Sequence, residues 1–208
     1  MAGHDGHLGQ VYAAAAPEDI ARAYDAWADT YDAEMAANGY RHPAICLALL
    51  SRHLAPGPGP ILDAGCGTGL MGDWLEILGY PVVEGLDLSE GMLARARAKG
   101  RYRALHRLAL GRPLPFADGA FAGVVSTGVF TTGHVGAEAL PELIRATRAG
   151  GLLSITVKDT VWDAGFRAAV EALVAAGTLA IAEITPPYVS MPGEAGTIPG
   201  RCLALRRL

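Results

Sequence analysis

Cysteine is scarce in this chain of 208 residues, and the few cysteines are poorly placed for cross-links or metal binding. Cys46, Cys66 and Cys202 are odd in number, lie far apart and form no C-x-x-C pair. This excludes a disulfide framework and a thiolate metal site, and it fits a reducing compartment. The sequence also lacks a basic, then apolar, N-terminal leader and any apolar run that could span a membrane. We therefore expect a cytoplasmic protein with no bound metal and no membrane attachment.

The chain also lacks an excess of basic residues, because 17 Lys and Arg stand against 21 Asp and Glu, for a net charge of −4. Nucleic acid and anionic membranes are therefore not expected as partners. One local exception is the basic run from Arg95 to Arg107, which would suit RNA if its side chains shared a face. The run crosses a predicted helix end into a predicted strand, and its sole aromatic residue is Tyr102. We interpret it as a solvated surface, with RNA binding as a rival that a salt-dependent binding assay would test.

The glycine-rich segment ILDAGCGTG, residues 61–69, lacks what phosphate binding requires. A P-loop needs a lysine after its glycines, and no lysine precedes Lys99. The dinucleotide fingerprint G-x-G-x-x-G needs a third glycine, but Leu70 stands in that position. Asp63 at the mouth of the turn would repel a pyrophosphate and attract a cation. The turn therefore favours S-adenosylmethionine, which carries a sulfonium and an ammonium and no phosphate.

Strand-like and helix-like segments alternate along the chain after a linker, APGPGP, at residues 55–60. Before it we expect a loose tail over 1–16 and helices over 17–39 and 43–53. After it, strands are predicted at 61–64, 82–87, 102–108, 121–126, 151–157, 179–185 and 201–207, with helices at 69–78, 89–99, 137–148 and 163–175. This alternation indicates βαβ units and a parallel sheet, which binds ligands beyond the carboxyl ends of its strands. We expect one domain over 1–208, with its core at 61–208.

Three motifs in the right order carry a family resemblance. Asp87 ends the second predicted strand, 24 positions after Asp63, where a carboxylate can accept both hydroxyls of a ribose. With the segments ILDAGCGTG, VEGLDLSEGML and LPFADGAFAGVVS, the chain resembles the class I S-adenosylmethionine-dependent methyltransferases. The segments YDAWADTYDAEM and GVFTTGHVGAEALPELI are similar to the methyltransferase-like proteins named after the Williams-Beuren syndrome region.

The resemblance implies an α/β fold and a cofactor site. The fold is a Rossmann-like three-layer sandwich with a seven-stranded sheet, order 3-2-1-4-5-7-6, whose last strand is antiparallel, and with an N-terminal helical lid. The cofactor is S-adenosylmethionine, with its methionine part at the glycine turn, its ribose at Asp87 and its adenine against Leu88 and Met92. The candidate cofactor-binding residues are Tyr24, Tyr31, Asp63, Gly65, Cys66, Gly67, Asp87, Leu88, Met92, Ala109, Leu110 and Ser126.

One departure from the family pattern lies after the third predicted strand. Related enzymes often carry an aspartate there that accepts the adenine amino group, whereas this chain has Ala109-Leu110. The change bears on how tightly adenine is held rather than on which cofactor binds. Cys66, inside the glycine turn, is interpreted as a small packing residue rather than a reactive thiol.

An aromatic stripe and one histidine complete the candidate site. Tyr24, Trp27 and Tyr31 lie at i, i+3 and i+7, a spacing that serves either core packing or contact with a ligand under the lid. His134 follows the fourth predicted strand, which borders the transferred methyl group in this fold. Its imidazole is the candidate catalytic residue, as a base or as a group that orients the acceptor. Transfer to a neutral amine, a thiolate or a carbanion would need placement and no base, so both roles stay open.

We therefore predict a monomeric or weakly dimeric methyltransferase that acts by in-line displacement on a small molecule or an exposed small group. The N-P-P-[YF] signature of enzymes that methylate amide or base nitrogens is absent. A non-catalytic S-adenosylmethionine-binding regulatory protein is the alternative, and Ala109 gives it some support.

Overall fold

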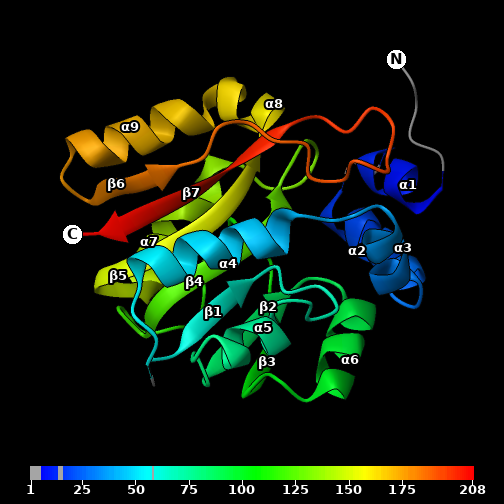
Figure 1. The fold of residues 1–208 in the computed structure, drawn as a ribbon, viewed down its shortest axis with the longest axis horizontal. Coiled ribbons are helices and arrows are strands. Elements are labelled where there is room, and N and C mark those ends of the chain that lie inside the picture. Colours follow the sequence, from blue (N-terminus) through cyan, green and yellow to red (C-terminus); the bar gives the residue numbers. More distant parts are fainter. Residues whose placement is uncertain (1–5, 14–15, 58) are drawn as a thin grey trace.

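The computed structural model describes residues 6–13, 16–57 and 59–208, which form one mixed sheet flanked by helices (Figure 1). The strands are β1 (Ile61–Ala64), β2 (Val83–Asp87), β3 (Ala104–Arg107), β4 (Phe121–Phe130), β5 (Thr147–Lys158), β6 (Leu179–Ile184) and β7 (Gly200–Arg207). Their order in the sheet is β3-β2-β1-β4-β5-β7-β6. Strand β7 pairs antiparallel with β5 and β6, and the other pairs are parallel. The predicted fold class, strand order and antiparallel strand are confirmed.

Helices cover both faces of this sheet because its central strands are apolar at successive positions. The helices are α1 (His7–Ala13), α2 (Pro17–Trp27), α3 (Tyr31–Ala37), α4 (His42–His53), α5 (Gly72–Ile77), α6 (Glu90–Lys99), α7 (Leu140–Ala146), α8 (Asp159–Val161) and α9 (Arg167–Ala175). On one face, Ile61, Val125 and Leu152 pack with α4 and α5. On the other, Leu62, Val124 and Leu153 pack with α7 and α9. The alternation of adjacent residues between the two cores follows from the two-residue period of a strand.

The segment before the core differs from the prediction in two ways. A single helix was expected over 17–39, but the chain forms α2 and α3 with a break at 28–30. Part of the tail expected to be loose forms α1, while residues 1–5, 14 and 15 lie outside the described residues. Helix α1 is held by a tertiary cluster in which its Val11 is buried with Trp27, Met35 and Met191. The last of these partners comes from the connection between β6 and β7, so local sequence gives no sign of it.

Strand β4 extends four residues beyond its predicted end and carries an irregularity that shapes the site. Its pairing with β5 shifts register between Ser126 and Phe130. Gly128 lies within the shift at φ +73°, and its N–H donates to the Thr156 hydroxyl at 2.9 Å rather than to a strand partner. A bulge of this kind turns backbone away from the sheet, here at the carboxyl end where a ligand would bind.

Candidate functional site

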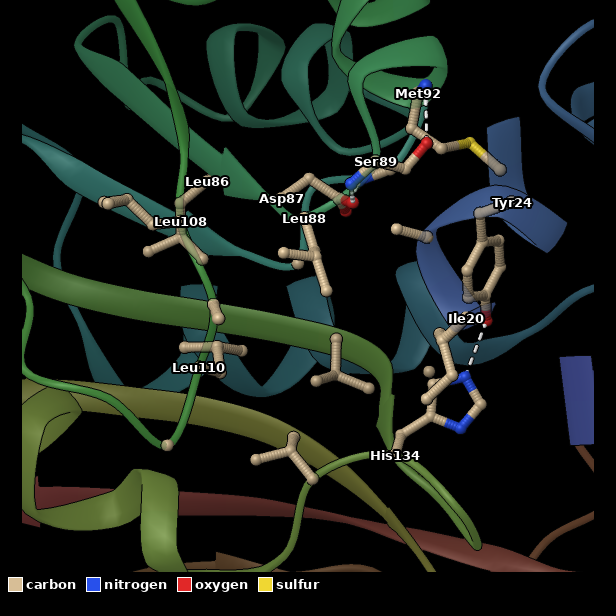
Figure 2. Close-up of a pocket in the computed structure, with 18 of the residues that line it drawn as sticks. Ile20, Tyr24, Leu86, Asp87, Leu88, Ser89, Met92, Leu108, Leu110 and His134 are labelled. Atoms are coloured by element: carbon tan, nitrogen blue, oxygen red, sulfur yellow. Dashed lines mark hydrogen bonds between the residues drawn. The ribbon is translucent and has the colours of Figure 1, made fainter. Parts of the chain in front are cut away.

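A cavity of about 410 Å³ opens at the carboxyl ends of β1, β2 and β4, beside helix α2 (Figure 2). Pockets for small molecules and cofactors are typically roughly 300–1,000 Å³. The predicted residues that line it are Tyr24, Tyr31, Gly65, Gly67, Asp87, Leu88, Met92, Ala109, Leu110 and His134. Sequence reasoning missed other lining residues, notably Ile20 and Ser89 and the bulge at residues 127–129. The spacing of α2 gave a signal for Ile20, one turn before Tyr24, whereas nothing in the sequence marks the bulge.

Two of the three glycines in the turn after β1 face different surroundings. Gly65, at φ +79°, lies so close to the β4 bulge that an added Cβ would come within 2.2 Å of Val129 Cγ2. Gly67, at φ +53°, would meet nothing within 4 Å and lines the cavity. Gly65 therefore lets β4 pack against the turn, and Gly67 leaves room for a ligand to approach the backbone.

Asp87 ties the end of β2 to the glycine turn. Its carboxylate accepts the N–H of Gly67 at 2.8 Å and that of Ser89 at 2.9 Å. Burial raises the pKa of Asp87, and these backbone donors act against that rise. Ser89 in turn caps α6, because its hydroxyl accepts the N–H of Met92 at 3.1 Å (Figure 2). The carboxylate is thus fixed at the cavity wall with acceptor capacity to spare.

Asp63 does not line the cavity, contrary to its predicted position at the mouth of the turn. Strand alternation directs it to the face opposite Leu62 and Ala64, where it is fully buried and its Oδ2 accepts the Tyr102 hydroxyl at 2.7 Å. Its Oδ1 has no partner among the described residues. Burial raises the pKa of Asp63 to about 7, Tyr102 opposes the rise, and the charge of Asp87 adds to it. The Asp63 side chain therefore makes no direct contact with a ligand in the cavity. It can act on such a ligand only through its electrostatic field, when the carboxylate is ionised.

Cys66 and Ser126 also lie outside the cavity lining. The Cys66 thiol packs at Gly85, where an added Cβ would lie 2.8 Å from its Sγ, and burial raises the pKa of the thiol. A raised pKa keeps a thiol protonated and unreactive, in agreement with the packing interpretation. The Ser126 hydroxyl donates to the carbonyl of Ala64 at 2.6 Å and so joins β4 to β1. Both residues therefore stabilise the strands that carry the cavity lining, without contacting the cavity themselves.

Tyr24 and His134 meet across the cavity, from α2 on one side and the loop after β4 on the other (Figure 2). The Tyr24 hydroxyl lies 3.2 Å from His134 Nε2, and His134 Nδ1 lies 3.3 Å from the Thr132 carbonyl. Burial lowers the pKa of His134, so the imidazole is neutral at pH 7. With its proton on Nδ1 directed at Thr132, Nε2 is the acceptor that faces the cavity and Tyr24.

Acidic side chains of α2 and α3 hold these helices against the core. Asp25 accepts the Ser89 hydroxyl at 2.5 Å and the N–H of Gly91 at 2.8 Å. Asp32 accepts Lys99 Nζ at 2.7 Å and also the hydroxyl of Thr68, beside the glycine turn. Sequence reasoning missed both contacts, although the spacing of Asp25, Asp29 and Asp32 marks one acidic face.

The basic run does not form an open positive surface. Arg95 pairs with Asp29, Arg97 with Glu90, Lys99 with Asp32, Arg101 with Asp73 and Glu76, and Arg103 with Glu84. Arg107, the last cation of the run, donates to the Leu88 carbonyl at 3.3 Å. Because the other five cations each have an acidic partner, the run offers little net charge to a phosphate backbone. The described ranges also contain no cluster of His, Cys, Asp or Glu that could hold a metal ion. No helix within them is long and apolar enough to cross a membrane.

Comparison with known proteins identifies the family. Residues 62–155 match the model of the family described as "Methyltransferase domain". The chain is 38% identical over 155 residues to human methyltransferase-like protein 27. The matched region covers 72% of this chain and 62% of that protein. It is 33% identical over 142 residues to demethylmenaquinone methyltransferase of Corynebacterium kroppenstedtii, over 67% of this chain and 59% of that enzyme. The chain belongs to the class I S-adenosylmethionine-dependent methyltransferases.

Solved structures of methyltransferases share the fold. A TehB-like S-adenosylmethionine-dependent methyltransferase from Corynebacterium glutamicum superimposes with a TM-score of 0.62 at 23% identity, over 88% of this chain and 99% of that one. The chain spans about three fifths of the length of the two curated methyltransferases named above.

The cofactor of this methyltransferase family fits the cavity described above. The open space at Gly67 admits a ligand beside the turn, and Asp87 presents a carboxylate of the kind that accepts ribose hydroxyls. At Ala109-Leu110 the wall is apolar, whereas the family resemblance implies an acid, so adenine would be held there by surface contact and by backbone groups.

Proposed function

We propose that this methyltransferase transfers the methyl group of S-adenosylmethionine to a small-molecule acceptor. One observation carries the proposal: the same cavity contains Gly67 and Asp87 on one wall and the Tyr24–His134 pair on another. The first wall suits the cofactor. The second brings a neutral imidazole next to where an acceptor would lie.

The proposed cofactor contacts follow from these positions. Gly65 and Gly67 flank the methionine part, Asp87 accepts the ribose hydroxyls, and Leu88 and Met92 cover the adenine together with Ala109 and Leu110. Tyr24 and Tyr31 close the site from α2 and α3. Asp63 favours a cationic ligand from beneath the turn when it is ionised.

When bound, S-adenosylmethionine would supply a methyl group on a positively charged sulfur, for in-line transfer to the acceptor with S-adenosylhomocysteine as the leaving group. His134 Nε2 then either takes a proton from the acceptor or holds the acceptor by a hydrogen bond, with the Tyr24 hydroxyl as its neighbour. The helices α2 and α3 exclude water, which strengthens the electrostatic interactions inside the site.

A small acceptor is favoured because α2 and α3 lie over the cavity and are tied to the core by Asp25 and Asp32. A bulky macromolecular acceptor would require these contacts to open. The neutralised basic run gives no support to an RNA acceptor.

Calorimetry with the purified protein tests the proposal. We expect S-adenosylmethionine and its demethylated product, S-adenosylhomocysteine, to bind, and NAD to bind much more weakly or not at all, because Asp63 and Asp87 oppose a pyrophosphate. Equal or tighter binding of NAD would sink the proposal. A screen of small metabolites for transfer of labelled methyl then separates an enzyme from the alternative of a non-catalytic regulatory protein, which would bind the cofactor and methylate nothing.

A further inference from the structure

A second, smaller cavity, of about 40 Å³, adjoins the cofactor cavity at the ends of β4 and β5. Tyr24, Tyr31 and Gly128 line both cavities, so the two meet at these residues. Trp27 and Tyr40 add two more aromatic rings to its wall. A ligand that entered the smaller cavity would therefore reach the larger one beside Tyr24, whose hydroxyl faces His134.

Lys158, the last residue of β5, brings a buried positive charge to this cavity. It is one of two lysines in the chain, and its side chain lines the cavity with only 8% of its surface exposed. Its Nζ donates to the Ile198 carbonyl at 2.7 Å and to the Ser190 hydroxyl at 3.4 Å, so both partners are neutral. Burial lowers the pKa of Lys158 to about 8, against the opposing effect of nearby Asp159, so the amine is still mainly charged at pH 7.

This charge has no acidic partner in the described part of the chain. No Asp or Glu lines the smaller cavity, and Oδ1 of the neighbouring Asp159 accepts Nε and Nη2 of Arg201, at 3.0 and 2.9 Å. A buried ammonium without a counter-ion destabilises a protein. An anionic ligand would supply that counter-ion and the acceptor for the third donor of Nζ.

We propose that the smaller cavity is the acceptor subsite and that Lys158 binds the carboxylate of the acceptor, which is a small organic acid. The inference rests on the proposed function and specifies the class of its substrate. The volume fits about three water-sized groups, which is the size of a carboxylate. The body of the acid would lie beside Tyr24 and Tyr31, which line both cavities, with the atom to be methylated in the larger cavity. The aromatic walls alone would also suit a cationic amine, but the ammonium of Lys158 repels one.

A matched set of ligands tests this subsite. We would titrate benzoate, its neutral amide benzamide and the cation benzylamine into the protein saturated with S-adenosylhomocysteine, by calorimetry. We expect benzoate to bind at least tenfold more tightly than benzamide, and benzylamine to bind most weakly. The absence of a preference for benzoate, including no binding of any of the three, would overturn the proposal.

Variants separate recognition of the acid from a purely structural role of Lys158. In Lys158→Met, we expect benzoate to bind no better than benzamide while S-adenosylhomocysteine binds as before. Arg167→Met, on the exposed surface of α9, removes a cation elsewhere and should leave the preference intact. If Lys158 serves only to hold Ile198 and Ser190, Lys158→Met will lower the melting temperature without changing the preference, and the proposal fails.

The inference and the proposed function fail in different ways. Failure of S-adenosylhomocysteine to bind the wild-type protein would count against the proposed function, whereas the benzoate preference concerns Lys158 and is also measurable without the cofactor. If Lys158→Met does not fold, the comparison of the three ligands on the wild-type protein still decides the question.

Discussion

At the scale of single residues, the site depends on two aspartates at neighbouring strand ends that differ in what surrounds them. Asp87 lies at the cavity wall with backbone donors on both oxygens. Asp63 lies on the neighbouring strand β1 and is fully buried; one of its oxygens accepts the Tyr102 hydroxyl, and the other has no partner among the described residues. The first lies at the cavity wall, where backbone donors oppose the rise in pKa that burial causes, and the second has a pKa of about 7.

Replacement of Asp87 should weaken cofactor binding. For Asp87→Ala we expect a loss of about 1–3 kcal/mol in the binding of S-adenosylhomocysteine, because ribose hydroxyls lose a charged acceptor. Calorimetry gives the dissociation constant, and circular dichroism shows whether the variant is folded. Asp118→Ala, at an exposed position, serves as the matched control. An unchanged dissociation constant in folded Asp87→Ala would remove this residue from the site.

Asp63 should make the stability of the protein depend on pH. Its folded-state pKa of about 7 lies above the unfolded value of about 3.8, so between these values the folded state keeps a proton that the unfolded state releases. The free energy of unfolding therefore falls as the pH rises through this window, by about 2–3 kcal/mol from pH 5 to pH 8. Asp63→Asn carries no such charge and should lack this part of the decline.

Urea unfolding of the wild type and of Asp63→Asn at pH 5 and pH 8 measures this difference. Tyr102→Phe provides a second comparison, because loss of its hydroxyl removes the donor to the Asp63 carboxylate and should deepen the decline. Parallel pH profiles of the wild type and Asp63→Asn would show that Asp63 titrates at an ordinary pKa.

At the scale of elements, α2 and α3 act as a cover that is attached by polar contacts at its base. Tyr24, Trp27 and Tyr31 pack on one another, with Trp27 and Tyr31 centroids 4.9 Å apart and Tyr24 and Trp27 centroids 6.1 Å apart. Asp25 and Asp32 bind α6 and the glycine turn. Because both acids contact residues beside Asp87 and Gly67, a ligand at that wall should affect how firmly the cover is held.

We therefore expect the cover to become more rigid when the cofactor product binds. Amide hydrogen exchange across residues 17–40 should slow markedly on addition of S-adenosylhomocysteine, while β1 at 61–64 changes less. Deletion of residues 1–40 should leave a folded core that binds the product more weakly. Two results together would show that Tyr24 and Tyr31 are packing residues and no part of the site. These are an exchange rate that does not change on addition of S-adenosylhomocysteine, and a truncated protein that binds it as tightly as the full chain.

The polar attachment itself can be tested with a single variant. Asp25→Ala should raise exchange in α2 and weaken binding of S-adenosylhomocysteine, since Ser89 and Gly91 lose their shared acceptor. Asp19→Ala removes an acid from the same helix at an exposed pair with Arg22 and should change neither. Equal effects of the two variants would argue against a specific attachment.

At the scale of the whole molecule, the charges of the surface are largely paired with one another. The net charge is −4, and five cations of the densest basic segment, from Arg95 to Arg103, pair with acids from the break between α2 and α3 and from α3, α5, α6 and β2. We expect no salt-dependent binding of RNA, which fluorescence anisotropy with a labelled single strand would detect. Affinity that fell steeply with added salt would restore the RNA-binding alternative.

The sequence predicted the sheet well because its order follows from local patterns and from a family resemblance. Short apolar strands that alternate with helices allow few right-handed topologies, and the motifs around Gly67 and Asp87 fix where a ligand binds. The environment of Asp63 was mispredicted because position in the motif was given more weight than strand alternation. Helix α1 and the surroundings of Lys158 could not be predicted, since both depend on the connection between β6 and β7, far away in the sequence.

The β4 bulge has a practical consequence for protein engineering. Gly128 lies where the two cavities meet, and an added Cβ there would come within 2.4 Å of the Tyr40 hydroxyl. A single methyl group at this position would act as a partition between two chambers. If the smaller cavity holds the acceptor, we expect Gly128→Ala to bind S-adenosylmethionine but to lose acceptor binding, and so to trap the state that precedes transfer.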